Sequence, residues 1–323
     1  MKILITGGLG FAGSAITKYL LKKGYKISVL DKLMFNNNHL KDFKNKNFKF
    51  YNIDILDYKN IEKFLKNNYF DIIFHLAAIV GDPACKIDQS LTKKTNLNAS
   101  INLFNLAKKF KTKRFIFFST CSNYGLSKNS KLLKETDNLK PLSLYAKSKV
   151  KYEKFLLNDK SIIQKIILRI STLYGVSPRM RFDLTINEFS KKVYFKEKFD
   201  IYHADTWRPY LNLKDLSLIV EKLIESKKLS KNKHIFNTGF SEENYTKRQI
   251  INSISKLLPK NKNYKFVEKD HFDKRNYKVN FSKIKLLRIK KTITLKKGIE
   301  DIIRYLKFSK NKKFNSKVFY NHK

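Results

Sequence analysis

A turn with three glycines near the start of the chain constrains the fold more than any other feature. A short apolar run, Ile3 to Ile5, precedes the turn, and Gly7, Gly10 and Gly13 follow at intervals of three. Apolar side chains then recur at helical spacing, so the stretch predicts a strand, a turn and a helix in that order. Glycines at these positions let the backbone approach a pyrophosphate and let the helix pack closely on the strand. The free N–H groups at the start of the helix favour phosphate oxygens.

An acidic residue stands where a dinucleotide-binding unit needs one. Asp31 ends the second apolar run, Ile27 to Leu30, at roughly 20 residues beyond the glycine turn. Its carboxylate can accept both ribose hydroxyls and would repel a 2′-phosphate, which favours NAD over NADP as the cofactor. The alternative is a turn that needs positive φ, followed by an aspartate that caps a helix or stabilises a turn.

The charge of the chain raises the question of a polyanionic partner. The 323 residues include 69 Lys and Arg against 27 Asp and Glu, a formal net charge of +42. Such a balance is typical of proteins that bind nucleic acid or an anionic membrane. The lysines are spread along the whole chain, however, and only nine residues are Arg, the better phosphate and base reader. We therefore expect a small anionic substrate and no nucleic-acid partner.

Two further properties bear on location. No apolar run approaches the roughly 18 residues of a membrane span, so no membrane partner is expected. Cys85 and Cys121 are the only cysteines and give no disulfide framework. A reducing, cytoplasmic location is the expectation that follows.

Apolar runs alternate with helical segments over the first 170 residues. This order predicts an α/β fold with a doubly wound parallel sheet, whose ligands bind at the carboxyl ends of the strands. Expected later strands cover 48–53, 71–75, 113–118 and 162–170, and a long helix covers 88–110.

Beyond Ser171 the pattern changes, which sets the expected domains. Residues 1–170 form an NAD-binding domain, to which 208–240 returns. Residues 171–207 and 241–308 form a smaller substrate-binding α/β cap, and 309–323 form a basic tail that we expect to fray.

Two more strand ends carry side chains suited to a cofactor. The carboxylate of Asp54 could accept from an adenine amino group while Ile55 packs on the ring, although helix capping by Asp54 is the alternative. The apolar and small residues Leu76, Ala77 and Ala78 would let a cofactor lie against the backbone. His75 has no second metal-ligand type at a suitable spacing, so we expect a core histidine and no metal site.

A tyrosine and a lysine carry the candidate chemistry. Tyr145 and Lys149 are four residues apart and therefore share one face of the expected helix. An ammonium beside a phenol favours the phenolate, so Tyr145 can serve as an acid/base with Lys149 as its partner. A hydroxyl from the end of the fifth strand could bridge the phenol and a substrate hydroxyl. The alternative is a solvated helix face.

In this order, the motifs resemble an extended short-chain dehydrogenase/reductase of the NAD-dependent epimerase/dehydratase type, a family with a Rossmann-like fold. The resemblance covers residues 1 to 307. The matching motifs are the glycine turn, Asp31, Asp54-Ile55, His75 to Ala78, Asn96, Ser119 to Gly125, Tyr145 with Lys149, Arg169 to Gly175 and Trp207 to Leu211.

The resemblance implies roles for individual residues. Thr120, Tyr145 and Lys149 would be catalytic. Those that would contact NAD are Gly7, Gly10, Phe11, Ala12, Gly13, Asp31, Asp54, Ile55, Leu76, Ala77, Ala78, Asn96, Ser119, Tyr145 and Lys149. In the family, arginines that match Arg208 and Arg275 hold the diphosphate of a nucleotide sugar. Arg179, Arg181 and Asn187 are further candidates for the substrate, with surface charge as the alternative for the arginines.

The chain departs from the family at two points. Sugar-nucleotide 4,6-dehydratases carry Asp-Glu after the catalytic Thr, whereas this chain has Cys121 and Ser122, so we do not expect elimination of water. Thr172 stands where members of the family usually have an Asn that contacts the substrate. The stretches 78–85, 175–184 and 273–277 resemble a subgroup that includes a GDP-heptose C4-dehydrogenase.

We therefore expect an NAD-dependent enzyme that acts on nucleotide-diphosphate sugars by hydride transfer at C4, either as an epimerase or as a C4-dehydrogenase. A 4-keto-sugar reductase and a basic RNA-binding protein on the same fold are the alternatives. A homodimer is also expected, because in this family the helices matching 89–110 and 145–158 pair across a two-fold axis. Leu103, Leu106 and Phe155 would supply its apolar contacts.

Overall fold

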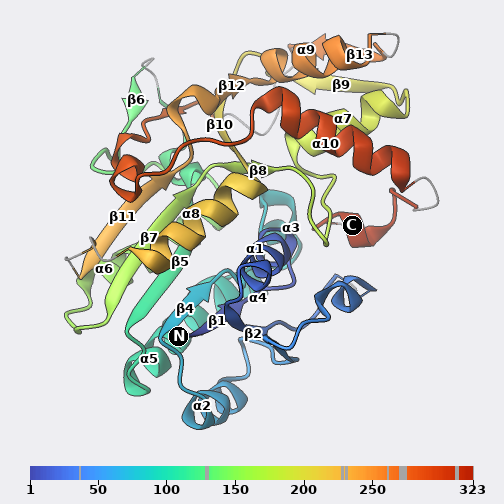
Figure 1. The fold of residues 1–323 in the computed structure, drawn as a ribbon. Helices are drawn as coiled ribbons and strands as arrows, with labels where there is room; N and C mark the ends of the chain where they lie inside the picture. Colours follow the sequence, from blue (N-terminus) through green and yellow to red (C-terminus); the bar gives the residue numbers. More distant parts are fainter. Residues whose placement is uncertain are drawn as a thin grey trace.

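The computed structural model describes residues 1–35, 38–127, 131–226, 229, 232–259, 262–268, 275–309 and 313–322. Its largest sheet has seven strands, all paired in parallel, in the order β11-β7-β5-β4-β1-β2-β3 (Figure 1). The strands are β1 (Lys2–Thr6), β2 (Lys26–Leu30), β3 (Phe48–Tyr51), β4 (Ile72–His75), β5 (Arg114–Thr120), β7 (Gln164–Ile170) and β11 (Lys233–Thr238).

Successive side chains of the central strands lie in different apolar layers. Ile3 and Ile5 of β1 belong to one buried cluster, whereas Leu4 belongs to the other. In β5, Ile116 belongs to the first cluster and Phe117 to the second. Because both faces of a parallel sheet are covered, its central strands are nearly continuous apolar runs. The predicted doubly wound α/β fold is confirmed.

Helices cover both faces of this sheet. On one face α1 (Phe11–Lys22) packs against α8 (Leu213–Glu225), and on the other lie α2 (Tyr58–Asn67), α5 (Ser100–Lys109) and α6 (Leu144–Asn158). Of the helices in the described part of the chain, none is both long and apolar enough to cross a membrane.

The long helix predicted for 88–110 is interrupted. It consists of α4 (Gln89–Lys93), a π-helical turn (Lys94–Ala99) and α5. A π-helical turn adds a residue to the helix and shifts the side chains that follow to a new direction. The hydrophobic periodicity of the sequence continues across it, which is why the sequence predicted one helix.

A second group of elements forms a cap (Figure 1). Its buried side chains form an apolar core separate from those of the large sheet. The cap holds α7 (Thr185–Tyr194), α9 (Lys247–Leu257), α10 (Leu295–Phe308) and the paired strands β9 (Phe199–Tyr202) and β13 (Tyr264–Val267). Figure 1 shows these elements grouped together at one end of the large sheet. The shorter remaining elements are α3 (Asp82–Ile87), β6 (Leu132–Leu133), β14 (Lys278–Val279) and the 3-10 helices Asn38–Phe43, Cys121–Tyr124, Ser241–Glu243, Ser282–Leu287 and Lys317–Phe319.

The segment 208–240, expected to return to the large sheet, does so in part. Its β11 lies at the edge of that sheet beside β7. In contrast, β10 (Trp207–Asn212) pairs with β8 (Thr172–Tyr174) and β12 (Asn244–Thr246) in a separate three-stranded sheet. This small sheet joins the two parts of the chain next to the ends of the long strands.

The tail expected to fray is instead packed on the cap over residues 313–322. Phe314 and Tyr320 are buried in the core of the cap, and the backbone N–H of Phe182 donates to the carbonyl of Phe319 at 2.9 Å. The Lys191 ammonium donates to the Tyr320 hydroxyl at 3.2 Å. The prediction was wrong because the aromatic partner of this tail, Phe182, lies far away in the sequence.

Candidate active site

A cavity of about 810 Å³ opens at the carboxyl ends of the parallel strands and extends to the cap. This volume lies within the usual range of small-molecule sites. The predicted site residues that line it are Gly7, Gly10, Phe11, Ala12, Gly13, Asp31, Asp54, Ile55, Leu76, Ala77, Ala78, Ser119, Thr120, Tyr145, Lys149, Arg179, Arg181, Arg208 and Arg275. The fold thus brings together residues that are up to 268 positions apart in the sequence (275 minus 7).

Two predicted site residues lie behind the cavity wall instead. Asn96, in the π-helical turn, accepts from the Ile79 N–H at 2.8 Å and donates to the Ile79 carbonyl at 2.9 Å. Asn187 accepts from the Gly175 N–H at 3.0 Å and donates to the carbonyls of Gly175 and Arg181. The amides of both residues are therefore occupied in holding the backbone of loops that do line the cavity.

The backbone packs so closely around the glycine turn that two of its positions leave no room for a side chain. Gly7 has φ +70°, and a Cβ on it would lie 2.7 Å from the Ala77 nitrogen. A Cβ on Gly13 would overlap the carbonyl oxygen of Gly7, because α1 packs directly on the turn. Gly10 precedes α1 as its N-cap, with no side chain between the helix start and the cavity. The two contacts show why Gly7 and Gly13 are glycines, and the start of α1 at the cavity wall fits a dinucleotide whose phosphates lie against the backbone.

The acidic residues after β2 and β3 face the same end of the cavity. Asp31 accepts from the backbone N–H groups of Leu9 (3.0 Å) and Leu33 (2.9 Å), which fixes its carboxylate beside the glycine turn. Burial raises the pKa of Asp31, and the two backbone hydrogen bonds oppose that rise. Asp54 is paired with Lys32 at 3.0 Å, and both side chains are about one third exposed.

Tyr145 and Lys149 lie on the first turns of α6 and both line the cavity. The Lys149 ammonium donates to the Phe118 carbonyl at 2.9 Å and lies 5.7 Å from the centroid of the Tyr145 ring. Burial lowers the pKa of Lys149 to about 7. Burial also raises the pKa of Tyr145, while the guanidinium groups of Arg181 and Arg275 favour its phenolate. Thr120 lies at the end of β5 and accepts from the Ser122 N–H at 3.1 Å.

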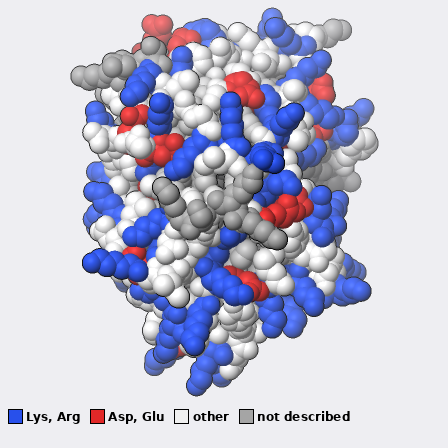
Figure 2. Space-filling model, turned by 60° about the vertical axis from the view of Figure 1, so that its left-hand side comes forward, with Lys and Arg blue, Asp and Glu red and all other residues white. Residues whose placement is uncertain are grey.

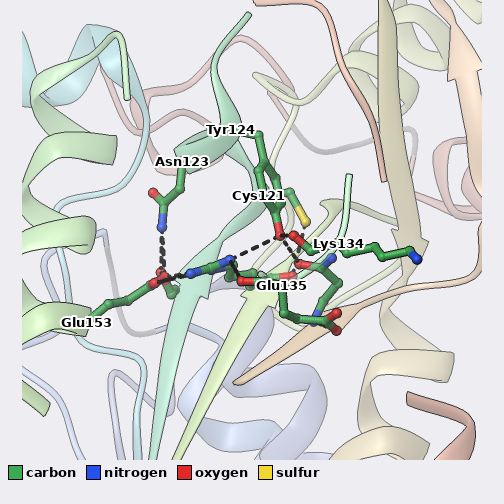
Figure 3. A network of polar contacts seen from close by, with 9 residues as sticks. Cys121, Asn123, Tyr124, Lys134, Glu135 and Glu153 are labelled. Atoms are coloured by element: carbon green, nitrogen blue, oxygen red, sulfur yellow. Dashed lines mark hydrogen bonds and ion pairs between the residues drawn. The ribbon is translucent and has the colours of Figure 1, made fainter. Parts of the chain in front are cut away.

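A buried ion pair joins Arg169 and Glu153. Figure 3 shows Glu153 with Asn123 and Tyr124 in the polar network around this pair. Arg169 of β7 donates to Glu153 of α6, with Nη2 2.9 Å from Oε2 and Nε 3.1 Å from the same oxygen. Glu153 also accepts from the Ser119 hydroxyl and from the Asn123 amide, and Arg169 donates to the Tyr124 hydroxyl. The network ties α6 to the end of β5, so it sets where Tyr145, Lys149 and Thr120 lie relative to one another. Ser119 lines the cavity, but its hydroxyl is directed to Glu153.

The other arginines of the cavity differ in how they are held. Arg181 forms two parallel hydrogen bonds of 2.9 Å with Asp183. Arg275 lies 3.2 Å from Asp82 and donates to the Ser122 hydroxyl. Arg208 donates to the carbonyls of Trp207 and Arg275. Its guanidinium carbon is 5.2 Å from the centroid of the Tyr277 ring.

Neither Cys121 nor His75 lines the cavity. Cys121 is 1% exposed and donates to the Arg169 carbonyl. His75 bonds to the hydroxyls of Thr6 and Ser100, each at 2.8 Å, and burial lowers its pKa to about 3. In the described part of the chain no group of three His, Cys, Asp or Glu side chains is placed to hold a metal ion.

Sequence reasoning missed several residues of this site. Glu153 could have been noticed, because it lies four residues after Lys149 on the same helix face. Asn321 and His322 of the tail also line the cavity, and nothing local in the sequence indicates this. The Asn321 amide donates to the Val80 carbonyl at 3.0 Å, and its N–H donates to Asp183 at 3.1 Å. Asp273 and Lys274 of the motif 273–277 lie outside the described residues.

Comparison with known proteins gives a family and several relatives. The sequence model of the NAD dependent epimerase/dehydratase family matches residues 3–239. The chain is 27% identical to a UDP-glucuronate 4-epimerase from Thermodesulfobacterium geofontis, over 94% of this chain and 95% of that protein. It is 29% identical to a dTDP-D-glucose 4,6-dehydratase from Dictyostelium discoideum, over 98% of this chain and 84% of the relative.

A solved structure agrees with this family. A UDP-glucuronic acid 4-epimerase from Bacillus cereus, in complex with UDP-glucuronic acid and NAD, superposes with a TM-score of 0.83 at 27% identity. The match covers 95% of this chain and 99% of that one.

Proposed function

The chain belongs to the NAD-dependent epimerase/dehydratase family, and from this premise we propose that it oxidises a nucleotide-diphosphate sugar at C4, as an epimerase or as a C4-dehydrogenase. The observation that carries the proposal is the placement of Tyr145, Lys149 and Thr120 in one cavity with the glycine turn. Bound NAD would supply the hydride acceptor. Gly7, Gly10, Gly13 and Asp31 are the residues that would hold it.

Tyr145 takes the proton of the C4 hydroxyl in this proposal. In the free protein burial raises the pKa of Tyr145, and Cys85 and Asp82 add to that rise. The guanidinium groups of Arg181 and Arg275 act in the opposite direction. Because burial lowers the pKa of Lys149 to about 7, its amine changes charge close to neutral pH. A partner that titrates near the working pH suits proton transfer to and from the phenol. Thr120, at the end of β5, can orient the sugar hydroxyl toward Tyr145.

The diphosphate of the sugar nucleotide is assigned to the arginines at the cap side of the cavity. Arg208 and Arg275 lie next to each other there, as the hydrogen bond from Arg208 to the Arg275 carbonyl requires. Planar guanidinium groups suit phosphate oxygens. The Asp82 carboxylate beside Arg275 holds that side chain in the absence of a phosphate.

Elimination of water is not part of the proposal. A 4,6-dehydratase needs an acid and a base next to the catalytic threonine, and here Cys121 faces away from the cavity while burial raises the pKa of its thiol. Ser122 does line the cavity, but its hydroxyl accepts from Arg275. Neither residue supplies a group that titrates near neutral pH.

The test is Tyr145→Phe, which removes the phenolic oxygen and keeps the ring. We expect kcat to fall by ~10²- to 10⁴-fold, with little change in NAD affinity, because the variant loses its acid/base catalyst. Single-turnover oxidation of UDP- and GDP-sugars, followed by nicotinamide absorbance, measures it. Tyr58→Phe, at an exposed position of α2, is the control.

Turnover of Tyr145→Phe close to that of the parent protein would overturn the assignment. The products separate the two reactions. An epimerase yields the C4 epimer with no net reduction of NAD, whereas a C4-dehydrogenase accumulates a 4-keto sugar and NADH. The relatives include 4-epimerases, which favours the first.

A homodimer stays part of the proposal, with Phe155 kept from the expected contact residues and Leu103 and Leu106 dropped. Leu103 and Leu106 are 1% and 2% exposed within one chain, so they cannot supply an interface. The outward side of α5 and α6 offers Ile101 and Phe155 among lysines such as Lys151. Light scattering at micromolar concentration tests it, and a mass of one chain would refute the dimer.

Binding of RNA gains no support from the face of the molecule that Figure 2 shows. Figure 2 shows basic side chains spread over all parts of the face in view, with acidic ones among them, rather than gathered in one stripe. A nucleic-acid site needs a concentrated basic footprint.

A further inference from the structure

Arg179 is a buried cation that forms no ion pair with a carboxylate of the described residues. Its side chain lies in the cavity wall and is 4% exposed, and its Nε and Nη2 atoms have no hydrogen-bond acceptor in the part of the chain that the structure describes. The guanidinium carbon lies 4.1 Å from the centroid of the Phe35 ring. Burial is the main cause that lowers the pKa of Arg179, to about 9. Burial of a charged donor without an acceptor costs free energy, and in a binding cavity this indicates an anionic ligand.

The backbone of this residue is fastened to the first turn of α1. The N–H of Arg179 donates to the Ser14 hydroxyl at 3.3 Å. Ser177, two residues earlier, donates to the carbonyl of Phe11 at 2.7 Å, and its hydroxyl lies 2.8 Å from that of Ser14. The loop that carries Arg179 therefore lies directly against the helix start that follows the glycine turn.

The contacts of Arg179 and its loop indicate a place between the two ends of the cavity. Its guanidinium lies over the ring of Phe35, four residues after Asp31 at the ribose-binding end, while Arg181 of the same loop pairs with Asp183 toward the cap. The charges of Asp31, Arg181 and Asp183 all act on the guanidinium. Arg181 also acts on Tyr145, at the reacting end. In NAD the diphosphate joins the adenosine ribose to the nicotinamide ribose. A cofactor that places its adenosine ribose at Asp31 and its nicotinamide near Tyr145 therefore has its diphosphate between them.

We propose that Arg179 binds the diphosphate of NAD, opposite the backbone N–H groups of the glycine turn. This assigns Arg179 to the cofactor rather than to the substrate, for which the sequence had made it a candidate. The two arginines of this loop then have different roles. Arg181 is held by Asp183, whereas the Nε and Nη2 atoms of Arg179 remain available to a ligand. The inference rests on NAD binding by the family and not on the carbon that is oxidised.

The test compares Arg179→Met and Arg179→Lys with the parent protein and with Arg304→Met, an exposed arginine on α10. Calorimetry on nucleotide-free protein measures the binding of NAD⁺, ADP and adenosine. We expect Arg179→Met to weaken NAD⁺ and ADP by about 10- to 100-fold, as for loss of hydrogen bonds to a charged group. The affinities of Arg179→Lys for NAD⁺ and ADP should lie between those of the parent protein and Arg179→Met, because Lys keeps the charge but not the planar donors. Adenosine, which lacks phosphate, should bind equally to all four proteins.

Thermal unfolding separates this role from simple packing. Removing an unpartnered buried charge should leave the melting temperature of the nucleotide-free Arg179→Met protein unchanged or higher. Equal losses of adenosine and ADP affinity with a lower melting temperature would point to packing and overturn the proposal. Unchanged ADP affinity with weakened UDP or GDP binding would return Arg179 to the substrate. If the parent protein binds neither NAD⁺ nor ADP, the cofactor premise itself fails, which is distinct from a failure at Arg179.

Discussion

At the scale of single residues, burial controls the chemistry of the Tyr145–Lys149 pair. The sequence predicts the pair, because the spacing of four and the preceding hydroxyl-rich strand end are both visible in it. The sequence does not reveal how far the amine is desolvated. Lys149 is 3% exposed, and its ammonium donates to the Phe118 carbonyl. Its pKa therefore depends on packing that only the folded chain creates.

This burial predicts a dependence of stability on pH. Burial lowers the pKa of Lys149 in the folded protein to about 7, well below the roughly 10.4 of an unfolded lysine. Between these values the unfolded chain binds the extra proton, so the free energy of unfolding should rise with pH, by at most ~1.4 kcal/mol per pH unit from this group. Below pH 7 the folded protein bears the cost of the buried charge.

Urea unfolding of nucleotide-free protein at pH 6.5 and 9 measures this effect. The parent protein should gain stability over this interval relative to Lys149→Met, in which the titrating group is absent. Equal changes in both proteins would mean that Lys149 titrates outside the interval.

At the scale of elements, helix α6 presents its chemistry along one face. Tyr145, Lys149 and Glu153 follow at intervals of four, and the last of them forms the buried ion pair with Arg169. The central strands of the large sheet could be predicted, because burial on both faces makes them apolar runs. The π-helical turn around Asn96 could not, since it depends on the bonds to the Ile79 backbone, far from any local pattern.

The ion pair should couple stability to catalysis. Glu153→Ala leaves Arg169 as an uncompensated buried charge, and we expect a loss of ~3–5 kcal/mol in the free energy of unfolding. The double variant Glu153→Ala/Arg169→Met should recover part of the stability, because no buried charge is left alone. Its kcat should stay low, since the tie between α6 and β5 is gone. Denaturant unfolding of the single and double variants measures their free energies of unfolding, and kcat is measured on each variant. A double variant no more stable than Glu153→Ala would contradict this account.

At the scale of the whole molecule, the cavity is completed by the tail. Local composition predicts a frayed segment, because 309–323 is polar and basic, yet Phe314 and Tyr320 find partners in the cap. Burial of this kind depends on residues more than a hundred positions away, such as Phe182, and therefore cannot be read from the segment itself.

The tail should accordingly affect the binding of the substrate. Asn321→Ala removes the hydrogen bond to the Val80 carbonyl. We expect the affinity for the nucleotide sugar to fall by about 2- to 10-fold, as for one neutral hydrogen bond. Lys317→Ala, at an exposed position of the same tail, should leave it unchanged. Titration calorimetry with the cofactor bound measures the affinity of both variants for the nucleotide sugar. Equal affinities would show that the tail does not contribute to substrate binding.

The residues that line the cavity come from nearly the whole sequence, from Gly7 to His322. A ligand in such a cavity contacts segments from nearly the full length of the chain, so it opposes the opening of any of them. Saturation at 100 times the dissociation constant adds about 2.7 kcal/mol to the free energy of unfolding. Since proteases act on opened chains, the steady-state amount of the protein should follow the supply of its nucleotides.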